Sequence, residues 1–150
     1  MFYLQEFEIS EDEGLYISVP FDLEGGTQGA SLEEVMGMSA EWLCGEVERS
    51  LMTGERLPST TMGNTPRAGG RVVLIGVNAN LGDIPSCSAS EAARRLGVSR
   101  PRVSKMLETG LLEGWRDGRN TRVTLASIEV RLASSPRPGR KPGKALAETR

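Results

Sequence analysis

The sequence predicts an α+β protein with two modules, the first in the order β-β-β-α-β and the second built from two helices and a hairpin. Three observations lead to this prediction. Apolar residues alternate near the N-terminus, which is the period of a half-buried strand. A Ser-x-x-Glu motif then introduces apolar residues at helical spacing. A second Ser-x-x-Glu motif introduces two short helices between residues 88 and 107.

Three extended segments are expected before residue 30. Residues 2–9 are rich in aromatic and aliphatic residues with rough alternation, and residues 15–20 alternate and end at a proline. They are expected to form a hairpin with a polar turn at residues 10–14. A short third strand is expected around Thr27–Gln28, and the β-branched run 71–77 predicts a fourth.

One long helix is expected between the third and fourth strands. Ser31 and Glu34 predict a capping box, in which each side chain accepts a hydrogen bond from the other residue's amide. Gly54 suits the C-cap. The buried face is expected to carry Leu32, Val35, Met36, Ser39, Leu43, Val47 and Leu51. Residues 57–70 are rich in turn residues and predict a loop or flexible crossover.

These segments define the expected domain boundaries. Residues 1–77 form the first domain, residues 78–85 a linker and residues 86–133 the second domain. Residues 134–150 are rich in Pro, Gly and basic residues, which predicts a disordered tail.

Charge is divided unequally along the chain. The net charge of −2 conceals 13 Asp or Glu in residues 1–60 against only Arg49 and Arg56. Residues 61–150 hold 16 Lys or Arg and 7 acids. A basic module attracts phosphate and an acidic module attracts a basic protein, so partners of opposite sign are expected.

The residue types present disfavour several functions. Histidine is absent, which removes the usual general base and the commonest zinc ligand. Cys44 and Cys87 lack the spacing of a metal or redox motif and are expected to be reduced thiols. No apolar run approaches the roughly 20 residues that span a bilayer, and the N-terminus lacks a signal-peptide pattern. We therefore expect a cytoplasmic protein with no metal, cofactor or membrane partner.

The second module is predicted to contain two capped helices. Ser88 and Glu91 form a second capping box, Gly97 ends the first helix and Ser99 caps the next. The inner face is expected to carry Ala92, Ala93, Leu96, Val103, Met106 and Leu107. In a helix-turn-helix, the outward residues of the second helix reach base edges and phosphates. The residues expected to do so here are Ser99, Arg100, Pro101, Arg102, Ser104 and Lys105.

A hairpin is expected to follow these helices. Asp117 and Gly118 indicate a type I′ turn, in which both central residues need positive φ. The arginines expected to contact phosphates from this hairpin, like a wing beside the DNA, are Arg116, Arg119 and Arg122. Ser127 is expected to cap a last helical turn at residues 128–133. Its expected core residues are Ile128 and Leu132.

Residues 88–133 resemble the winged helix-turn-helix of the excisionase and MerR-like families. The resemblance is carried by SEAARRLGVSRPRVSKML at 90–107 and GLLEGWRDGRNTRVTL at 110–125. It implies DNA binding and does not specify the sequence that is bound.

Three hypotheses fit the acidic first module. Glu11, Asp12, Glu13, Asp22 and Glu24 could offer oxygen ligands to Mg²⁺ in an enzyme, but they lie in turns without a fixed spacing and no nucleophile accompanies them. The module could instead dimerise or sense a ligand. It could also present its acidic surface to a basic protein.

Residues 2–59 resemble the HicB antitoxin domain. The matching motifs are EGLYISVP at 13–20, GTQG at 26–29, SLEE at 31–34 and LPS at 57–59. The resemblance implies a degraded RNase H-like fold without nuclease activity, which binds a small basic RNA-cleaving toxin of the HicA type. The residues expected to contact the toxin are Glu8, Glu11, Asp12, Glu13, Tyr16, Asp22 and Glu24.

Together these features predict a non-enzymatic antitoxin of a type II toxin-antitoxin pair. Residues 1–77 would bind a HicA-like toxin, and residues 86–133 would bind operator double-stranded DNA as a homodimer or higher homo-oligomer and repress the pair's own promoter. The charge division agrees, because an RNA-cleaving protein needs a basic surface and an acidic domain is its electrostatic complement. The alternative is a stand-alone winged-helix transcription regulator whose acidic module dimerises or senses a ligand.

Overall fold

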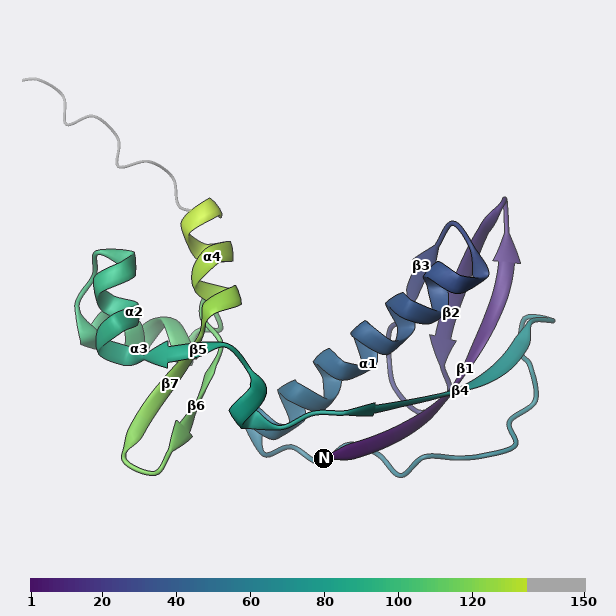
Figure 1. Ribbon diagram of the computed structural model, residues 1–150, viewed down its shortest axis with the longest axis horizontal. Coiled ribbons are helices and arrows are strands. Elements are labelled where there is room, and N and C mark those ends of the chain that lie inside the picture. Colours follow the sequence, from purple (N-terminus) through teal and green to yellow (C-terminus); the bar gives the residue numbers. More distant parts are fainter. Residues whose placement is uncertain (135–150) are drawn as a thin grey trace, which may run out of the picture. The chain divides into compact units, whose positions relative to one another are not determined.

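The computed structural model describes residues 1–134, which separate into two compact units. The first unit is Met1–Ile84 and the second begins at Pro85. The expected α+β class is confirmed, with two antiparallel sheets and four α-helices in residues 1–134 (Figure 1). The predicted tail at 134–150 lies outside the described residues, apart from Ser134 at the end of the last helix. Within residues 1–134, no helix combines the length and the hydrophobicity that a membrane span requires.

The first unit contains a four-stranded antiparallel sheet in the order β3-β2-β1-β4. Its strands are β1 (Phe2–Asp12), β2 (Leu15–Pro20), β3 (Thr27–Gly29) and β4 (Arg71–Asn78), which confirms the four expected strands. Asp12 pairs with Leu15, so only Glu13 and Gly14 remain in the first turn. Both have positive φ, 49° and 81°, as a type I′ turn requires. The turn expected at residues 10–14 is therefore too long.

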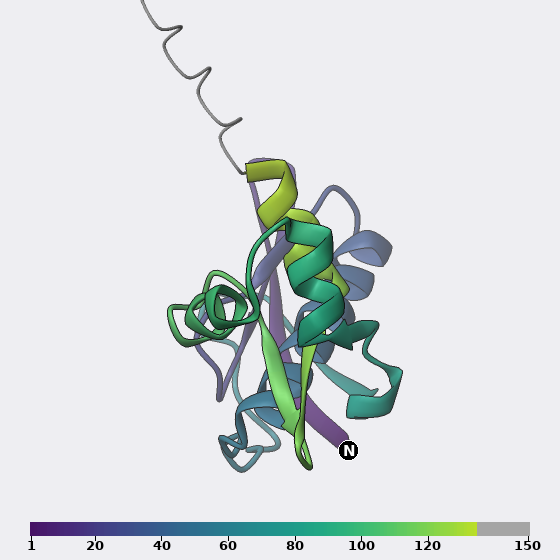
Figure 2. The same cartoon turned by 90° about the vertical axis from the view of Figure 1, so that its left-hand side faces the viewer.

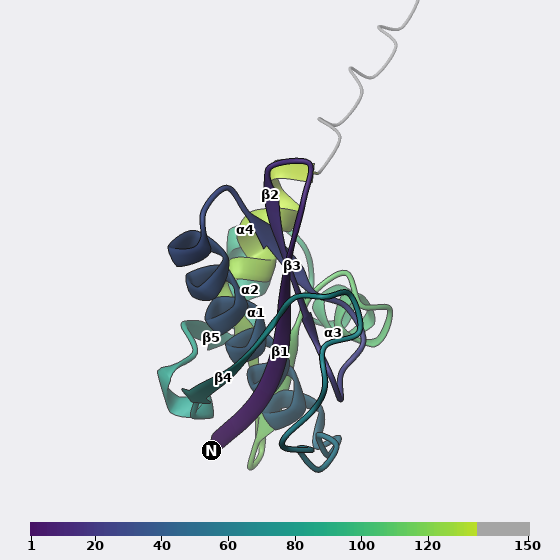
Figure 3. The ribbon, with the colours of Figure 1, turned by 90° about the vertical axis from the view of Figure 1, so that its right-hand side faces the viewer.

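Helix α1 (Leu32–Thr53) lies along one face of this sheet (Figure 3). The Ser31 hydroxyl accepts a hydrogen bond from the Glu34 amide at 3.1 Å, and Gly54 ends the helix with φ of 75°. Both expected caps are confirmed. The Glu34 carboxylate, however, accepts from the amide of Ala30 at 2.6 Å rather than from that of Ser31.

The core of the first unit lies between α1 and the sheet. Phe7 and Leu43 are fully buried, and the Phe7 ring meets the Trp42 ring edge-on with centroids 6.0 Å apart. The buried Ser39 is hydrogen-bonded to Ser18 of β2 at 2.7 Å. Met36 was expected on the buried face, but 41% of it is exposed. On a helical wheel Met36 lies between Leu43 and Val47, which are both buried, so periodicity alone could not predict its exposure.

The expected linker at residues 78–85 belongs mostly to the first unit. Ala79 and Ile84 are buried, and the short 3₁₀ helix η1 (Leu81–Asp83) contacts α1. The Ala79 amide also donates to the Met1 carbonyl at 2.9 Å. The segment is therefore packed as far as Ile84.

The second unit combines a small sheet with three helices (Figures 1 and 2). Its sheet has the order β5-β7-β6. The elements are β5 (Ser86–Ser88), α2 (Ala89–Leu96), α3 (Arg100–Glu108), β6 (Gly114–Asp117), β7 (Asn120–Thr124) and α4 (Leu125–Ser134). β5 was not expected from the sequence, because a three-residue strand is too short to show an alternating pattern.

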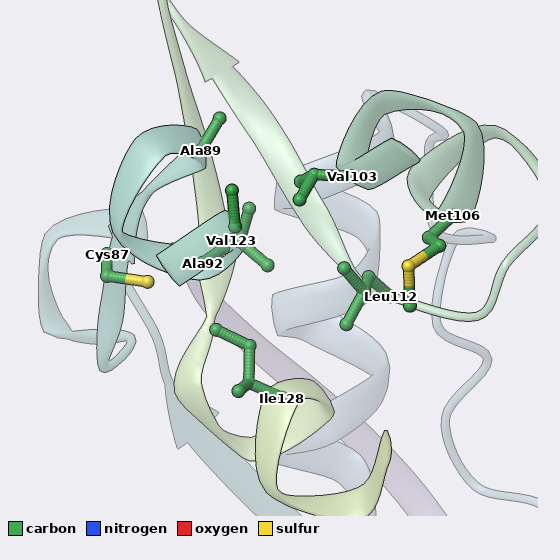
Figure 4. Close-up of a cluster of buried hydrophobic side chains, with 9 residues drawn as sticks. Cys87, Ala89, Ala92, Val103, Met106, Leu112, Val123 and Ile128 are labelled. Carbon is green, nitrogen blue, oxygen red and sulfur yellow. The ribbon is translucent and has the colours of Figure 1, made fainter. Parts of the chain in front are cut away.

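One buried cluster joins these elements (Figure 4). Its members include Cys87, Ala89, Ala92, Val103, Met106, Leu112, Val123 and Ile128. Ile128 is 2% exposed as expected, but Leu132 is 50% exposed and lies outside the core. α4 also begins earlier than expected, because the Thr124 hydroxyl accepts from the Ser127 amide at 3.3 Å and takes the cap position given to Ser127.

Ile128→Ala is expected to lower the free energy of unfolding of the second unit by about 2–4 kcal/mol, because it leaves a cavity in a packed core. Leu132→Ala is the matched control, with an expected change of no more than about 0.5 kcal/mol at an exposed position. A urea titration followed by the NMR amide signals of residues 85–134 measures both. Equal effects would show that α4 packs through a different face.

Candidate nucleic-acid interface and acidic surface

Local capping fixes the geometry of α2 and α3. The Ser88 hydroxyl accepts from the Glu91 amide at 3.1 Å, and the Ser99 hydroxyl accepts from the Arg102 amide at 3.3 Å. Gly97 separates the helices with φ of 66°. These expected caps are confirmed. The Glu91 carboxylate does not return to the Ser88 amide, however, because it pairs with two arginines of its own helix.

Packing between the two helices determines which side of α3 faces outward. Ala92 and Val103 are fully buried, and Met106 is 3% exposed. Because alanine is small, α2 and α3 can approach closely through this side, and the rest of α3 is left in solvent apart from the half-buried Leu107. The exposed residues include the whole set expected to contact DNA, namely Ser99, Arg100, Pro101, Arg102, Ser104 and Lys105.

The exposed part of α3 is strongly electropositive. Lys105 lies 3.5 Å from Glu108, whereas neither Arg100 nor Arg102 makes an ion pair within residues 1–134. The first turn of α3 contains no acidic residue. The N-terminal end of a helix carries a partial positive charge, which adds to that of the two arginines. This end of α3 therefore favours an anionic partner.

The β6–β7 hairpin carries further exposed cations. Asp117 pairs with Asn120, so the turn consists of Gly118 and Arg119 rather than being centred on Asp-Gly. Only Gly118 has positive φ, 60°, which is the pattern of a type II′ turn and corrects the expected type I′. Arg119 at the turn and Arg116 on β6 are both exposed, as their expected role requires.

Arg122 occupies a different environment from the other two hairpin arginines. It is half-buried, and its guanidinium donates to the Ser86 carbonyl at 2.9 Å and to the Ser86 hydroxyl at 2.9 and 3.1 Å. These bonds join β7 to β5. The expectation that Arg122 contacts phosphate is therefore corrected to a structural role, which the sequence could not reveal because β5 was not recognised.

The first unit gathers exposed acids at one hairpin. Glu11, Asp12 and Glu13 lie at its end and are all exposed, and Glu11 pairs across the strands with the half-buried Tyr16. Glu24 is also exposed, but it follows Pro20 and therefore lies past the opposite end of β2 from this turn. No three metal-ligating side chains of residues 1–134 come together to hold a metal ion. The arrangement offers a negative surface rather than a set of converging ligands.

Glu8, which was also expected to contact a partner, serves the fold instead. Its side chain lies beneath the loop at residues 60–70, and the residue is only 6% exposed. Its carboxylate accepts from the backbone amides of Arg67 at 2.7 Å, Ala68 at 2.6 Å and Gly70 at 3.0 Å. We call residues 60–70 the anchored loop.

Asp22 and Glu6 hold the preceding part of the anchored loop. Asp22 accepts from the Thr61 amide and hydroxyl, both at 2.8 Å, and from the Gln5 side chain at 2.9 Å. Glu6 accepts from the amides of Gly63 at 2.9 Å and Asn64 at 2.8 Å. The expected toxin contacts of Glu8 and Asp22 are thus corrected, because both carboxylates are occupied by the chain itself. Of the two alternatives expected for residues 57–70, a loop or a flexible crossover, the structure shows a loop, and these bonds hold its residues 60–70 in place.

The hydrogen bonds to these carboxylates favour their charged forms. The backbone amides of Asn64 and Gly63 lower the pKa of Glu6. Burial alone would raise the pKa values of Glu8 and Asp22, but donors from the anchored loop outweigh it and both pKa values are lowered. The anchored loop therefore depends on ionised carboxylates.

Comparisons with known proteins returned no match. No family model matches the chain, and no curated protein and no solved structure matches it.

Glu8→Gln is expected to lower the free energy of unfolding of the first unit by about 2 kcal/mol at neutral pH, because three backbone amides lose a charged acceptor. The folded-state pKa values of Glu6, Glu8 and Asp22 are lowered. Their stabilisation is therefore complete above the unfolded carboxyl pKa of about 4 and is lost as the pH falls through the folded values. Urea unfolding at a series of pH values, followed by the amide signals of residues 1–84, measures both effects.

Glu41→Gln is the control for this experiment, because Glu41 is exposed on α1. It should leave the stability and its acid dependence almost unchanged. A Glu8 variant that unfolds in acid as the wild type does would contradict the anchoring role of Glu8.

Proposed function

We propose that the second unit is a winged helix-turn-helix domain that binds double-stranded DNA. The observation that carries this proposal is the exposed N-terminal half of α3, whose Arg100 and Arg102 have no ion-pair partner within residues 1–134. The Ser99 cap and the buried Val103 hold this half of the helix in place. The sequence resemblance to excisionase and MerR-like proteins supports the same assignment.

The contacts divide by position. Arg100, Arg102, Ser104 and Lys105 would meet base edges and nearby phosphates from α3, with Ser99 and Pro101 at its first turn. Arg116 and Arg119 would contact the phosphate backbone from the hairpin. Arg122 would support the hairpin through Ser86 rather than touch DNA.

We further propose that the first unit is a degraded RNase H-like domain of the HicB type, which neutralises a basic HicA-like toxin by direct binding. Its β-β-β-α-β order and the quoted sequence motifs support this. The toxin-facing surface would consist of the exposed Glu11, Asp12 and Glu13 with Tyr16 beside them, and Glu24, past the other end of β2, would contact a different part of the toxin. A toxin that cleaves RNA must attract phosphate, so its surface should be basic and complementary to these acids.

The proposed whole is a non-enzymatic, cofactor-free, cytoplasmic antitoxin that also represses its own operon. DNA binding would control the supply of the pair, and the acidic unit would hold the toxin inactive. A homodimer or higher homo-oligomer would match the two half-sites of a palindromic operator.

Arg102→Ala is expected to weaken binding to the DNA upstream of the chain's own gene by about 1–3 kcal/mol and to relax its sequence preference. Arg119→Ala should weaken binding to all sequences alike and reduce the salt slope by about 1, as loss of a phosphate contact does. Arg56→Ala, in the acidic unit, is the matched control. Fluorescence anisotropy at several salt concentrations measures the three variants, and normal binding by Arg102→Ala would remove α3 from the interface.

Replacing Glu11, Asp12 and Glu13 together by Lys is expected to abolish neutralisation of the toxin, because a basic partner would then meet like charge. The control replaces Glu33 and Glu41, two exposed acids of α1, in the same way. Growth of cells that express the basic protein of the adjacent reading frame, with or without each variant, is the measurement. An adjacent product that is harmless alone, or toxic despite residues 1–84, would refute the antitoxin proposal and favour the stand-alone regulator.

A further inference from the structure

β4 forms one edge of the sheet in the first unit (Figure 3). Its eight residues pair on one side with β1, and no other strand of residues 1–134 pairs with its second side. The opposite edge of the sheet is β3, which has only three residues. β4 is therefore the long edge of this sheet.

The register determines which backbone groups of β4 remain free. The Ala79 amide donates to the Met1 carbonyl, so the odd-numbered residues of β1 direct their backbone groups toward β4. The Phe21 amide donates to the Glu6 carbonyl, which places the even-numbered residues of β1 on the β2 side. Because paired residues of an antiparallel ladder exchange hydrogen bonds, the odd-numbered residues of β4 are bonded to β1. The residues whose N–H and C=O groups point outward are Val72, Leu74, Gly76 and Asn78.

This edge has none of the features that protect exposed strands. Residues 71–78 contain no Pro, no Lys and no acidic residue, and Arg71 at one end is the single charge. Natural edge strands are usually shortened, charged, bulged or covered, because their free backbone groups are a template for another strand. The edge is thus open to strand addition.

An exposed apolar patch adjoins the same edge. Ile75 packs toward α1, so its neighbour Leu74 lies on the opposite face, where 49% of it is exposed. Phe2 is 66% exposed, and its ring lies 3.2 Å from the point where Gly76 would carry a Cβ atom. A strand added to β4 would cover part of this patch while it satisfies the free backbone groups.

We propose that the occupant is β4 of a second copy of this chain, paired antiparallel to form one continuous sheet. The edge is self-complementary about a two-fold axis, which is the commonest symmetry of dimers. In the register that pairs the whole strand, Leu74 lies opposite Gly76 of the partner subunit, beside the Phe2 ring that occupies the space over that glycine, so two apolar side chains would meet there. Charge favours a second copy over a basic partner, because β4 is nearly uncharged whereas the acids of the unit lie elsewhere.

Sedimentation equilibrium of the full chain tests this pairing. The wild type is expected to be dimeric, and Val72→Pro and Leu74→Lys are expected to lose the dimer. Val72→Pro removes an N–H that points outward, so the ladder with β1 keeps its bonds, and Leu74→Lys changes only an exposed side chain. Leu132→Lys, at a leucine of α4 that is 50% exposed, is the matched control and should remain dimeric.

Hydrogen exchange gives a second readout at single residues. In the wild-type dimer, the amides of Leu74 and Gly76 should exchange as slowly as those of Val73 and Ile75, and only the first pair should become fast in Leu74→Lys. Three results would each overturn the proposal. They are a monomeric wild type, loss of the dimer in Leu132→Lys alone, and slow exchange of the Leu74 amide that appears only when the basic protein encoded by the adjacent reading frame is added. A monomeric wild type would also count against the proposed dimeric binding to a palindromic operator, whereas loss of the dimer in the β4 variants alone leaves DNA contact by α3 untouched, so the two proposals can be told apart.

Discussion

The first unit depends on three carboxylates that bind the backbone of their own chain. Glu6, Glu8 and Asp22 accept hydrogen bonds from the anchored loop, which has no helix or strand to satisfy its amides. A loop packed against a sheet needs partners for its N–H groups, since unpaired buried amides are costly. These bonds explain why five consecutive residues of β1, from Gln5 to Ile9, are buried: α1 covers one face of the strand and the anchored loop lies over the other.

This use of carboxylates also shapes the charge of the unit. Carboxylates that accept hydrogen bonds from backbone N–H groups contribute little negative charge to the outer surface. The negative potential is therefore concentrated where the remaining carboxylates are exposed. The hairpin end with Glu11, Asp12 and Glu13 is such a place. The positive charges of the second unit are divided in the same way. Arg122 is hydrogen-bonded to β5, whereas Arg116 and Arg119 face solvent. In both units, the total charge is therefore larger than the charge that a partner could contact at the surface.

The sequence predicted those features whose signals are local. The Ser31, Ser88 and Ser99 caps depend on residues three apart, and the structure contains all of them. The sequence could not predict the role of a side chain whose hydrogen-bond partner is distant along the chain or is a backbone group. Glu8 alternates with Phe7 and Ile9, which is the pattern of a solvent-facing position. The backbone amides that bind its carboxylate lie about 60 residues away, and every residue type except proline has such an amide, so the sequence does not reveal them. Arg122 was misassigned for the same reason, because β5 is too short to be recognised.

The turn between β1 and β2 contains a residue that does not suit its backbone conformation. Glu13 has φ of 49° and is the one non-glycine residue of the described chain with positive φ. Glycine adopts this conformation freely, whereas a residue with a Cβ atom loses roughly 1 kcal/mol or more. A Glu13→Gly chain would fold to the same hairpin with less strain and one charge fewer. The glutamate therefore holds its carboxylate at the tip of the hairpin at the expense of folding stability, which makes this position a natural starting point for engineering a more stable variant.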